Sequence, residues 1–163
     1  MSKKVAVVMG SDSDLDTMRP CIQRLQSFGI PAEVRVISAH RTPVAAEELA
    51  SDAMENGFGV IIAAAGKAAH LAGVLAAYTP LPIIGVPIKT SMMGGLDSLL
   101  SMVQMPKGIP VACVAVDGAD NAAILAAQML ALSDPTLTDK LAQFKARMAE
   151  EVAAKDRSIA EKL

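Results

Sequence analysis

Aromatic side chains are scarce in this chain of 163 residues, which contains no tryptophan, one tyrosine and three phenylalanines. Proteins that bind single-stranded nucleic acid commonly stack the bases on aromatic rings, and this chain has few rings to offer. Basic residues form no long run, and the formal net charge is −2. Because DNA, RNA and anionic membranes attract dense patches of lysine and arginine, we expect neither nucleic acid nor a membrane as a partner.

Cysteines and long apolar runs are scarce as well. Cys21 and Cys113 fall within a helical and a strand-like pattern, which indicates buried free thiols in a reducing cytosol. Two histidines and two separated cysteines do not have the spacing of a zinc site. No uncharged apolar run reaches the roughly 18 residues of a membrane span, and no charged-then-apolar leader opens the chain. These absences predict a soluble, cytoplasmic protein that binds no metal.

Apolar residues, in contrast, make up 52% of the chain, enough to bury a core in one domain spanning residues 1–163. Short apolar runs alternate with segments of helical periodicity, and strands are predicted at residues 5–9, 32–38, 60–65, 82–87 and 111–116. Apolar strands joined through helices are typical of a parallel sheet covered on both faces. The predicted fold class is a three-layer α/β domain, flavodoxin-like or Rossmann-like, with a central parallel sheet of about five strands and an extra C-terminal helix.

Local signals predict where several helices begin and end. Gly29 is expected to stop the first helix, and Thr42 to cap a helix that starts at Pro43 and closes at the Asn-Gly pair 56–57. A last helix, about residues 135–163, should be capped by Asp134. One face of it carries an apolar stripe formed by Leu137, Leu141, Phe144, Met148 and Val152.

The turns after the strands are the candidate site, because ligands of parallel α/β sheets bind beyond the carboxyl ends of the strands. They read MGSDSD, SAHRTP, AAGKAAHLAG, VPIKTSMMGG and DGADN. His40 beside Arg41 at a strand end favours a catalytic function, whereas His70 is equally compatible with a packed, hydrogen-bonded ring. Lys67 and Lys89 are expected to be solvated.

Several familiar sites are disfavoured by these turns. The first turn is not G-x-G-x-x-G and the chain has no G-x-x-x-x-G-K-[ST], so a dinucleotide or nucleoside triphosphate site has little support. The acidic run at residues 12–16 is similar to the start of a calcium loop. It has Thr17 where that loop needs glycine and Gln23 where it needs glutamate.

An Asp-x-Asp pair after a first strand also occurs in aspartyl-phosphate phosphatases. Here a glycine and a serine displace Asp12 from the strand end, and no acidic pair after a later strand could hold magnesium. A simpler interpretation is that Ser13 and Asp16 form a capping box that starts the first helix.

The chain resembles the N5-carboxyaminoimidazole ribonucleotide mutase family of purine biosynthesis in four segments, which read VMGSDSD, SAHRTP, AAGKAAHLAG and QMPKGIPVACVAV followed by NAAILAAQ. The similarity runs from Val5 to about Leu132, with the motifs in the family's order. The third motif departs from the family pattern. Members often read GGAAHLPG where this chain has GKAAHLAG, so Lys67 and Ala72 differ.

The resemblance implies an enzyme that moves a carboxylate from the exocyclic nitrogen of an aminoimidazole ring to ring carbon C4, by decarboxylation and recarboxylation. It implies no cofactor, neither metal nor ATP. It also implies a homo-octamer in which the helix of residues 135–163 packs on neighbouring subunits. His40 is implied to be the proton shuttle, which returns a proton to the nitrogen and takes the one at C4.

Substrate-binding residues follow from the motif positions. The resemblance implies that Ser11 and Arg41 bind the phosphate of the nucleotide, that Asp14 binds the ribose hydroxyls, and that the loop around Gly66 holds the carboxylate. The full implied substrate-binding set is Gly10, Ser11, Asp14, Ser38, Ala39, Arg41, Ala65, Gly66, Ala68, His70 and Leu71.

Two other functions remain open. One is a related carboxylase, which fixes free CO2 on aminoimidazole ribonucleotide and tends to carry lysine where this chain has Arg41. The other is a non-catalytic nucleotide-binding module of the same fold, for which the pairing of His40 with Arg41 is unnecessary.

Overall fold

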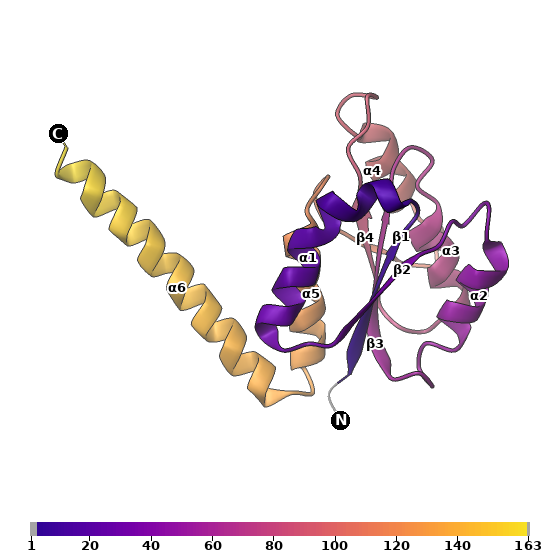
Figure 1. Ribbon diagram of the computed structural model, residues 1–163, viewed down its shortest axis with the longest axis horizontal. Helices are drawn as coiled ribbons and strands as arrows, with labels where there is room; N and C mark the ends of the chain where they lie inside the picture. The colour runs from indigo at the N-terminus through magenta and orange to yellow at the C-terminus, as the bar shows by residue number, and fades with distance from the viewer. Residues whose placement is uncertain (1–2, 163) are drawn as a thin grey trace.

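A five-stranded parallel sheet lies at the centre of the part of the chain that the computed structural model describes, residues 3–162 (Figure 1). Its strands are β1 (Lys4–Met9), β2 (Ala32–Val36), β3 (Phe58–Ala65), β4 (Ile83–Pro87) and β5 (Ala112–Cys113). They are arranged in the order β2-β1-β3-β4-β5, which is the order of flavodoxin-like sheets. The predicted fold class is therefore confirmed.

Helices cover both faces of this sheet. They are α1 (Leu15–Phe28), α2 (Pro43–Ser51), α3 (Leu71–Tyr78), α4 (Leu96–Val103) and α5 (Ala119–Ala131). Helices α1 and α5 pack on one face and α2 and α3 on the other, while α4 packs beside β4 and β5 (Figure 1). The molecule thus has the three layers expected for strands that are apolar on both sides.

The strand β1 shows how the sequence produces two cores. Successive side chains of a strand point to opposite faces, so Val5 and Val7 join the core under α1 and α5. Ala6 and Val8 join the core under α2 and α3. All four are completely buried, and full burial of a valine side chain contributes about 1.5 kcal/mol or more to stability.

Two predicted helix boundaries are confirmed. Gly29 ends α1 in the left-handed conformation, with φ of 72°, and its N–H donates to the carbonyl groups of Gln26 and Leu25. Asp134 caps α6 (Pro135–Ala160), because its carboxylate accepts hydrogen bonds from the first free N–H groups, those of Thr136 at 3.0 Å and Leu137 at 3.4 Å.

Other boundaries differ from the prediction. Helix α2 ends at Ser51, and residues 52–57 form turns before β3. Thr42 does precede α2 but does not cap it, because its hydroxyl accepts from Ser38 N and donates to Ser38 O, both at 3.0 Å. The alanine-rich stretch at residues 68–78 is expected to be helical throughout, but helix α3 begins at Leu71, since residues 66–70 form a loop.

The strand β5 is shorter than predicted. Val114 N still donates to Gly85 O at 3.1 Å and Asp117 N donates to Pro87 O at 2.8 Å, so the chain continues beside β4 beyond Cys113. Regular pairing is lost between these two bonds as the chain turns at Asp117, which has φ of 56°. Apolar composition alone did not reveal this turn.

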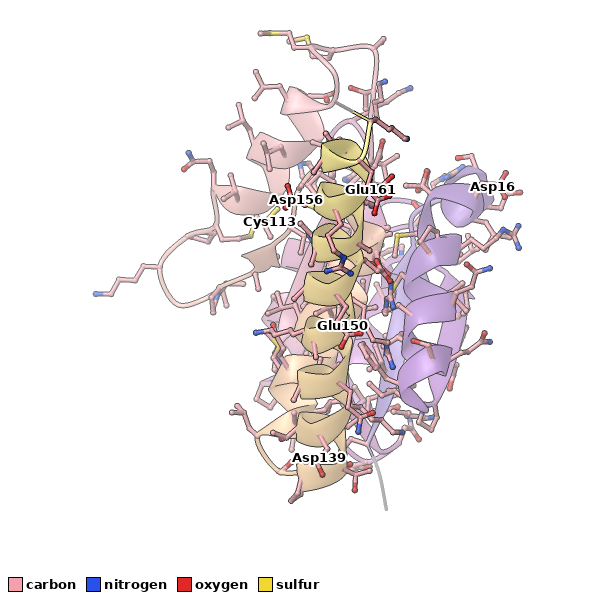
Figure 2. The ribbon with its side chains drawn as sticks, turned by 90° about the vertical axis from the view of Figure 1, so that its left-hand side faces the viewer. Asp16, Cys113, Asp139, Glu150, Asp156 and Glu161 are labelled. Carbon is pink, nitrogen blue, oxygen red and sulfur yellow. The ribbon has the colours of Figure 1, made fainter. Side chains whose placement is uncertain are left out.

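The helix α6 leaves the body of the molecule (Figure 1). Leu137 and Leu141 are buried, and the Phe144 ring packs edge-on against Phe28 with 5.7 Å between centroids. Farther along the same stripe, Met148 and Val152 are 41% and 65% exposed. Figure 2, in which α6 faces the viewer, shows carboxylates such as Glu150 and Asp156 along the outer part. None of the helices within residues 3–162 has the length and hydropathy needed to cross a bilayer.

Candidate active site

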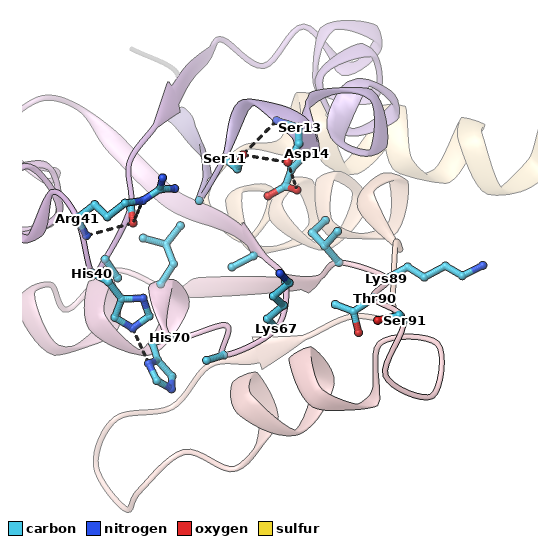
Figure 3. Close-up of a pocket in the computed structure, with 18 residues that line it drawn as sticks. Ser11, Ser13, Asp14, His40, Arg41, Lys67, His70, Lys89, Thr90 and Ser91 are labelled. Carbon is cyan, nitrogen blue, oxygen red and sulfur yellow. Dashed lines mark hydrogen bonds between the residues drawn. The ribbon is translucent and has the colours of Figure 1, made fainter.

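The turns after β1, β2, β3 and β4 meet at the carboxyl edge of the sheet and enclose a pocket of about 650 Å³ (Figure 3). The strand β1 lies between β2 and β3, so three turns that are far apart in the sequence become neighbours. Every residue expected at the site lines this pocket: His40, Gly10, Ser11, Asp14, Ser38, Ala39, Arg41, Ala65, Gly66, Ala68, His70 and Leu71. The turn after β5 contributes no lining residue.

The first turn is organised by Ser11, and the predicted capping box of Ser13 with Asp16 is wrong. Ser11 precedes a short 3₁₀ helix, η1 (Asp12–Asp14), and its Oγ accepts a hydrogen bond from Ser13 N at 3.3 Å. The Ser13 hydroxyl also lies 2.9 Å from Ser11 Oγ. Asp16 instead pairs with Arg19 at 2.9 Å. Two serine hydroxyls therefore stand together at the pocket, ahead of a helix N-terminus.

Asp14 is a mostly buried carboxyl group, 8% exposed, that still lines the pocket. Burial raises its pKa, because a carboxylate loses solvation there, and the negative charges of Asp117 and Asp12 act in the same direction. Hydrogen bonds from Ser13 and Ser11 lower the pKa but do not offset the burial. In its charged form Asp14 has two oxygens that accept hydrogen bonds, which suits a pair of neighbouring hydroxyl groups.

Ser38 positions Arg41 within the turn that follows β2. The Ser38 hydroxyl accepts from Arg41 N at 3.2 Å and from Arg41 Nε at 3.4 Å. No ion pair in residues 3–162 includes Arg41. The guanidinium therefore keeps its remaining N–H donors and its full charge for an anionic ligand.

His40 and His70 form a hydrogen-bonded pair in the pocket. Nε2 of His40 lies 2.7 Å from Nδ1 of His70, and the rings meet edge-to-face at 78° with centroids 4.9 Å apart. One of the two nitrogens must carry a hydrogen, so the tautomer of one ring fixes that of the other. His70 is exposed to the pocket and does not belong to the core. Of the two interpretations of His70, the structure favours a site residue.

Sequence reasoning missed six lining residues: Ser13, Lys67, Ile88, Lys89, Thr90 and Ser91. The last four follow β4, in one of the five turns that the sequence predicts to form the site, but no motif assigns these residues a role. Lys89 and Thr90 are held by hydrogen bonds to residues outside this turn. Lys89 N donates to Asp117 Oδ1 at 2.8 Å, and the Thr90 hydroxyl donates to Asp97 Oδ1 at 2.6 Å.

Within the described residues, no group of three or more His, Cys, Asp or Glu side chains is placed to hold a metal ion. The chemistry of the pocket is that of two imidazoles, one carboxyl group, serine hydroxyls and basic side chains.

Comparison with known proteins bears on what this pocket does. The sequence profile described as AIR carboxylase matches residues 4–151. A protein of Mycobacterium tuberculosis named N5-carboxyaminoimidazole ribonucleotide mutase is 55% identical over 94% of this chain and 88% of its own. A protein of the same name from Pyrococcus horikoshii is 52% identical over 96% of this chain and 89% of its own.

Two further comparisons widen this set. A chloroplastic phosphoribosylaminoimidazole carboxylase of Vigna aconitifolia is 50% identical over 93% of this chain, which spans 27% of the plant protein. The crystal structure of Treponema denticola PurE superposes with a TM-score of 0.88 at 27% identity, covering 96% of this chain and 98% of the other. Because the AIR carboxylase profile matches residues 4–151 of the 163 residues, the chain belongs to the AIR carboxylase family.

Proposed function

We propose that this protein is a mutase that converts N5-carboxyaminoimidazole ribonucleotide to 4-carboxyaminoimidazole ribonucleotide in purine biosynthesis, with His40 as the proton shuttle. The observation that carries this proposal is that His40 lines the same pocket as an arginine, a carboxyl group and a serine turn. The substrate needs all of these groups, because it combines a phosphate, a ribose and a ring whose protons must move.

The nucleotide is held by the first two turns in this proposal. The phosphate is bound by the Ser11 hydroxyl and the Arg41 guanidinium, which has no other ion-pair partner in residues 3–162. The Asp14 carboxylate accepts hydrogen bonds from the two ribose hydroxyls. This division also explains why a phosphate-binding turn carries an acid, because Asp14 binds the sugar and not the phosphate.

The reaction then proceeds by transfer of CO2 within the pocket. The bond between the exocyclic nitrogen and the carboxylate breaks, its electron pair stays on the nitrogen, and that nitrogen takes a proton from His40. The electron-rich C4 next forms a bond to the released CO2. Neutral His40 removes the proton from C4, which restores the aromatic ring and recharges the histidine for the next cycle. No net proton, oxidant or metal is consumed.

The bond to His70 supports His40 in this role. With Nε2 of His40 engaged 2.7 Å from His70, Nδ1 of His40 has no hydrogen-bond partner within residues 3–162 and can exchange a proton with the substrate. The neighbouring loop at Gly66 and Ala68 brings small residues and backbone to the pocket, which leaves room to hold CO2.

A carboxylase that uses free CO2 is the second candidate, because the Vigna aconitifolia relative bears that name. The two functions are separated by supplying either N5-carboxyaminoimidazole ribonucleotide without bicarbonate or aminoimidazole ribonucleotide with bicarbonate. A mutase forms the C4 product from the first substrate, after correction for spontaneous decarboxylation in a protein-free control. Product formed only from the second pair would replace the mutase with the carboxylase.

The proposal includes a cytoplasmic homo-octamer of single-domain subunits. Its support is the outer part of α6, where Met148 and Val152 of the stripe are 41% and 65% exposed, and Ile159 beyond them is 60% exposed. Neighbouring subunits would cover these side chains. The free thiols of Cys21 and Cys113 suit a reducing compartment.

A further inference from the structure

Lys67 has a backbone conformation that lysine rarely adopts. It has φ of 58°, in the left-handed region where a side chain collides with its own backbone. The conformation is held in place, because Lys67 O accepts hydrogen bonds from Ala69 N at 2.8 Å and from the Ser101 hydroxyl at 3.4 Å. Glycine would occupy this position without strain, and glycine is common there in the motif described above. A strained lysine at a pocket suggests that the side chain has a use.

The side chain of Lys67 lies inside the pocket. Figure 3 shows its ammonium end directed away from the loop backbone, toward the turn that carries Ser11, Ser13 and Asp14. No ion pair in residues 3–162 includes Lys67. Lys89, at the rim of the same pocket, points its ammonium away from the other side chains drawn. Each lysine adds one positive charge near the pocket, but only the side chain of Lys67 points toward the serine turn.

We propose that Lys67 is a second cationic ligand of the substrate's phosphate, acting together with Arg41. This inference rests on the proposed function, which supplies the nucleotide. A phosphate near neutral pH carries up to two negative charges, and Arg41 balances only one of them. Lysine binds phosphate as a point charge, so it needs none of the two-pronged geometry that Arg41 provides.

The migrating carboxylate is the other anionic group of the substrate, and it is a poorer partner for Lys67. The ammonium end points toward the serine turn and not toward the pair of His40 and His70, where the carboxylate must react. A cation against the N-carboxylate would also stabilise the ground state, whereas the first chemical step requires that this charge be lost as CO2. Lys67 at the phosphate strengthens binding without slowing that step.

The test compares two ligands that differ only in the phosphate: 4-carboxyaminoimidazole ribonucleotide and the corresponding riboside. Calorimetric titration is performed on the parent protein and on Lys67→Met, which keeps the aliphatic stem and removes the charge. We expect the variant to bind the nucleotide about tenfold more weakly, the worth of one charge-assisted contact at a solvent-accessible site, and the riboside equally well. Lys67→Arg should restore nucleotide affinity to within about threefold, since it restores the charge.

The control is Lys89→Met, which removes one charge from the rim of the pocket without removing a side chain that points into it. Its affinity for the nucleotide should stay within about twofold of the parent. A third variant, Lys67→Gly, should bind the nucleotide as weakly as Lys67→Met while its melting temperature equals or exceeds that of the parent, because glycine relieves the left-handed strain. That result would show that the weaker binding is not a folding defect.

Three results would overturn the inference. Equal loss of nucleotide and riboside affinity in Lys67→Met would assign the lysine to the carboxylate. Unchanged affinity for both would leave Lys67 as a solvated side chain. Equal losses of nucleotide affinity in Lys67→Met and Lys89→Met would show that only the total charge near the pocket matters, and not a contact made by Lys67. Turnover of the parent tests the proposed mutase separately: a parent that binds the nucleotide without converting it refutes that activity but leaves the titrations decisive for Lys67.

Discussion

Replacing His40 by asparagine separates proton transfer from binding. Asparagine fills similar space and forms hydrogen bonds, but it does not exchange a proton near neutral pH. If His40 serves both proton transfers, turnover should fall by about 10²–10⁴, the usual contribution of general acid–base catalysis. That loss corresponds to a barrier higher by roughly 3–5 kcal/mol.

The structure sets the expected cost of the same change to stability. His40 is exposed, and the bond to His70 at 2.7 Å is the one hydrogen bond that its side chain forms within residues 3–162. Losing one such bond costs about 0.5–1.5 kcal/mol at most. For a protein of this size the melting temperature should then fall by only a few degrees, roughly 2–4 °C per kcal/mol. The expected increase in the activation barrier is therefore several times the expected loss in the free energy of unfolding.

The assay combines three measurements on one preparation of His40→Asn: calorimetric binding of 4-carboxyaminoimidazole ribonucleotide, steady-state turnover and a thermal melt. We expect binding within a few-fold of the parent, a small change in melting temperature and the large loss of turnover. His70→Asn is the matched control, because it breaks the same hydrogen bond but leaves the His40 ring. Its turnover should fall by about tenfold or less.

Two outcomes would refute the reasoning. Near-parent turnover in His40→Asn would remove His40 from the chemistry altogether. Affinity and turnover that weaken in parallel would make His40 a residue that orients the ligand and does not move the proton.

Arg41, Asp14 and the exposed stripe of α6 can each be tested by one substitution. Arg41→Lys keeps the charge but loses the planar fork, so KM should rise by about tenfold or more with the fold intact, and an unchanged KM would show that Arg41 is merely solvated. Asp14→Asn should increase the free energy of unfolding at neutral pH. Burial raises the pKa of the folded Asp14 carboxyl above its unfolded value, so the parent loses stability as pH rises through the folded pKa, and the advantage of the variant should vanish below the unfolded value of 3.8. Denaturant unfolding across that pH range measures this, and an advantage that persisted at low pH would contradict the electrostatic cause. Light scattering at micromolar concentration should show an octamer, and Val152→Glu on the exposed stripe should reduce the assembly without lowering the helix content; a stable parent monomer would contradict the assembly.

Local physical rules made much of the fold predictable from the sequence. The conformations of Gly29 and Asp134 depend on neighbours within a few residues. The end of α1 and the start of α6 could therefore be located from the local sequence. The strands β1, β3 and β4 were recognisable because burial on both faces demands an unbroken apolar run. Thr42 was misassigned because a nearby backbone, that of Ser38, competed for its hydroxyl.

The motifs of the sequence determined which residues were candidates for the site, and the tertiary structure decided how they meet. Nothing local places His40 against His70, which is 30 positions away, or aims Lys67 and Lys89 in different directions. The strand order β2-β1-β3-β4-β5 brings the turns after β1, β2 and β3 together. That order results from burial of both sheet faces by the helices, a property of the whole packed chain, and no periodicity within a single segment encodes it.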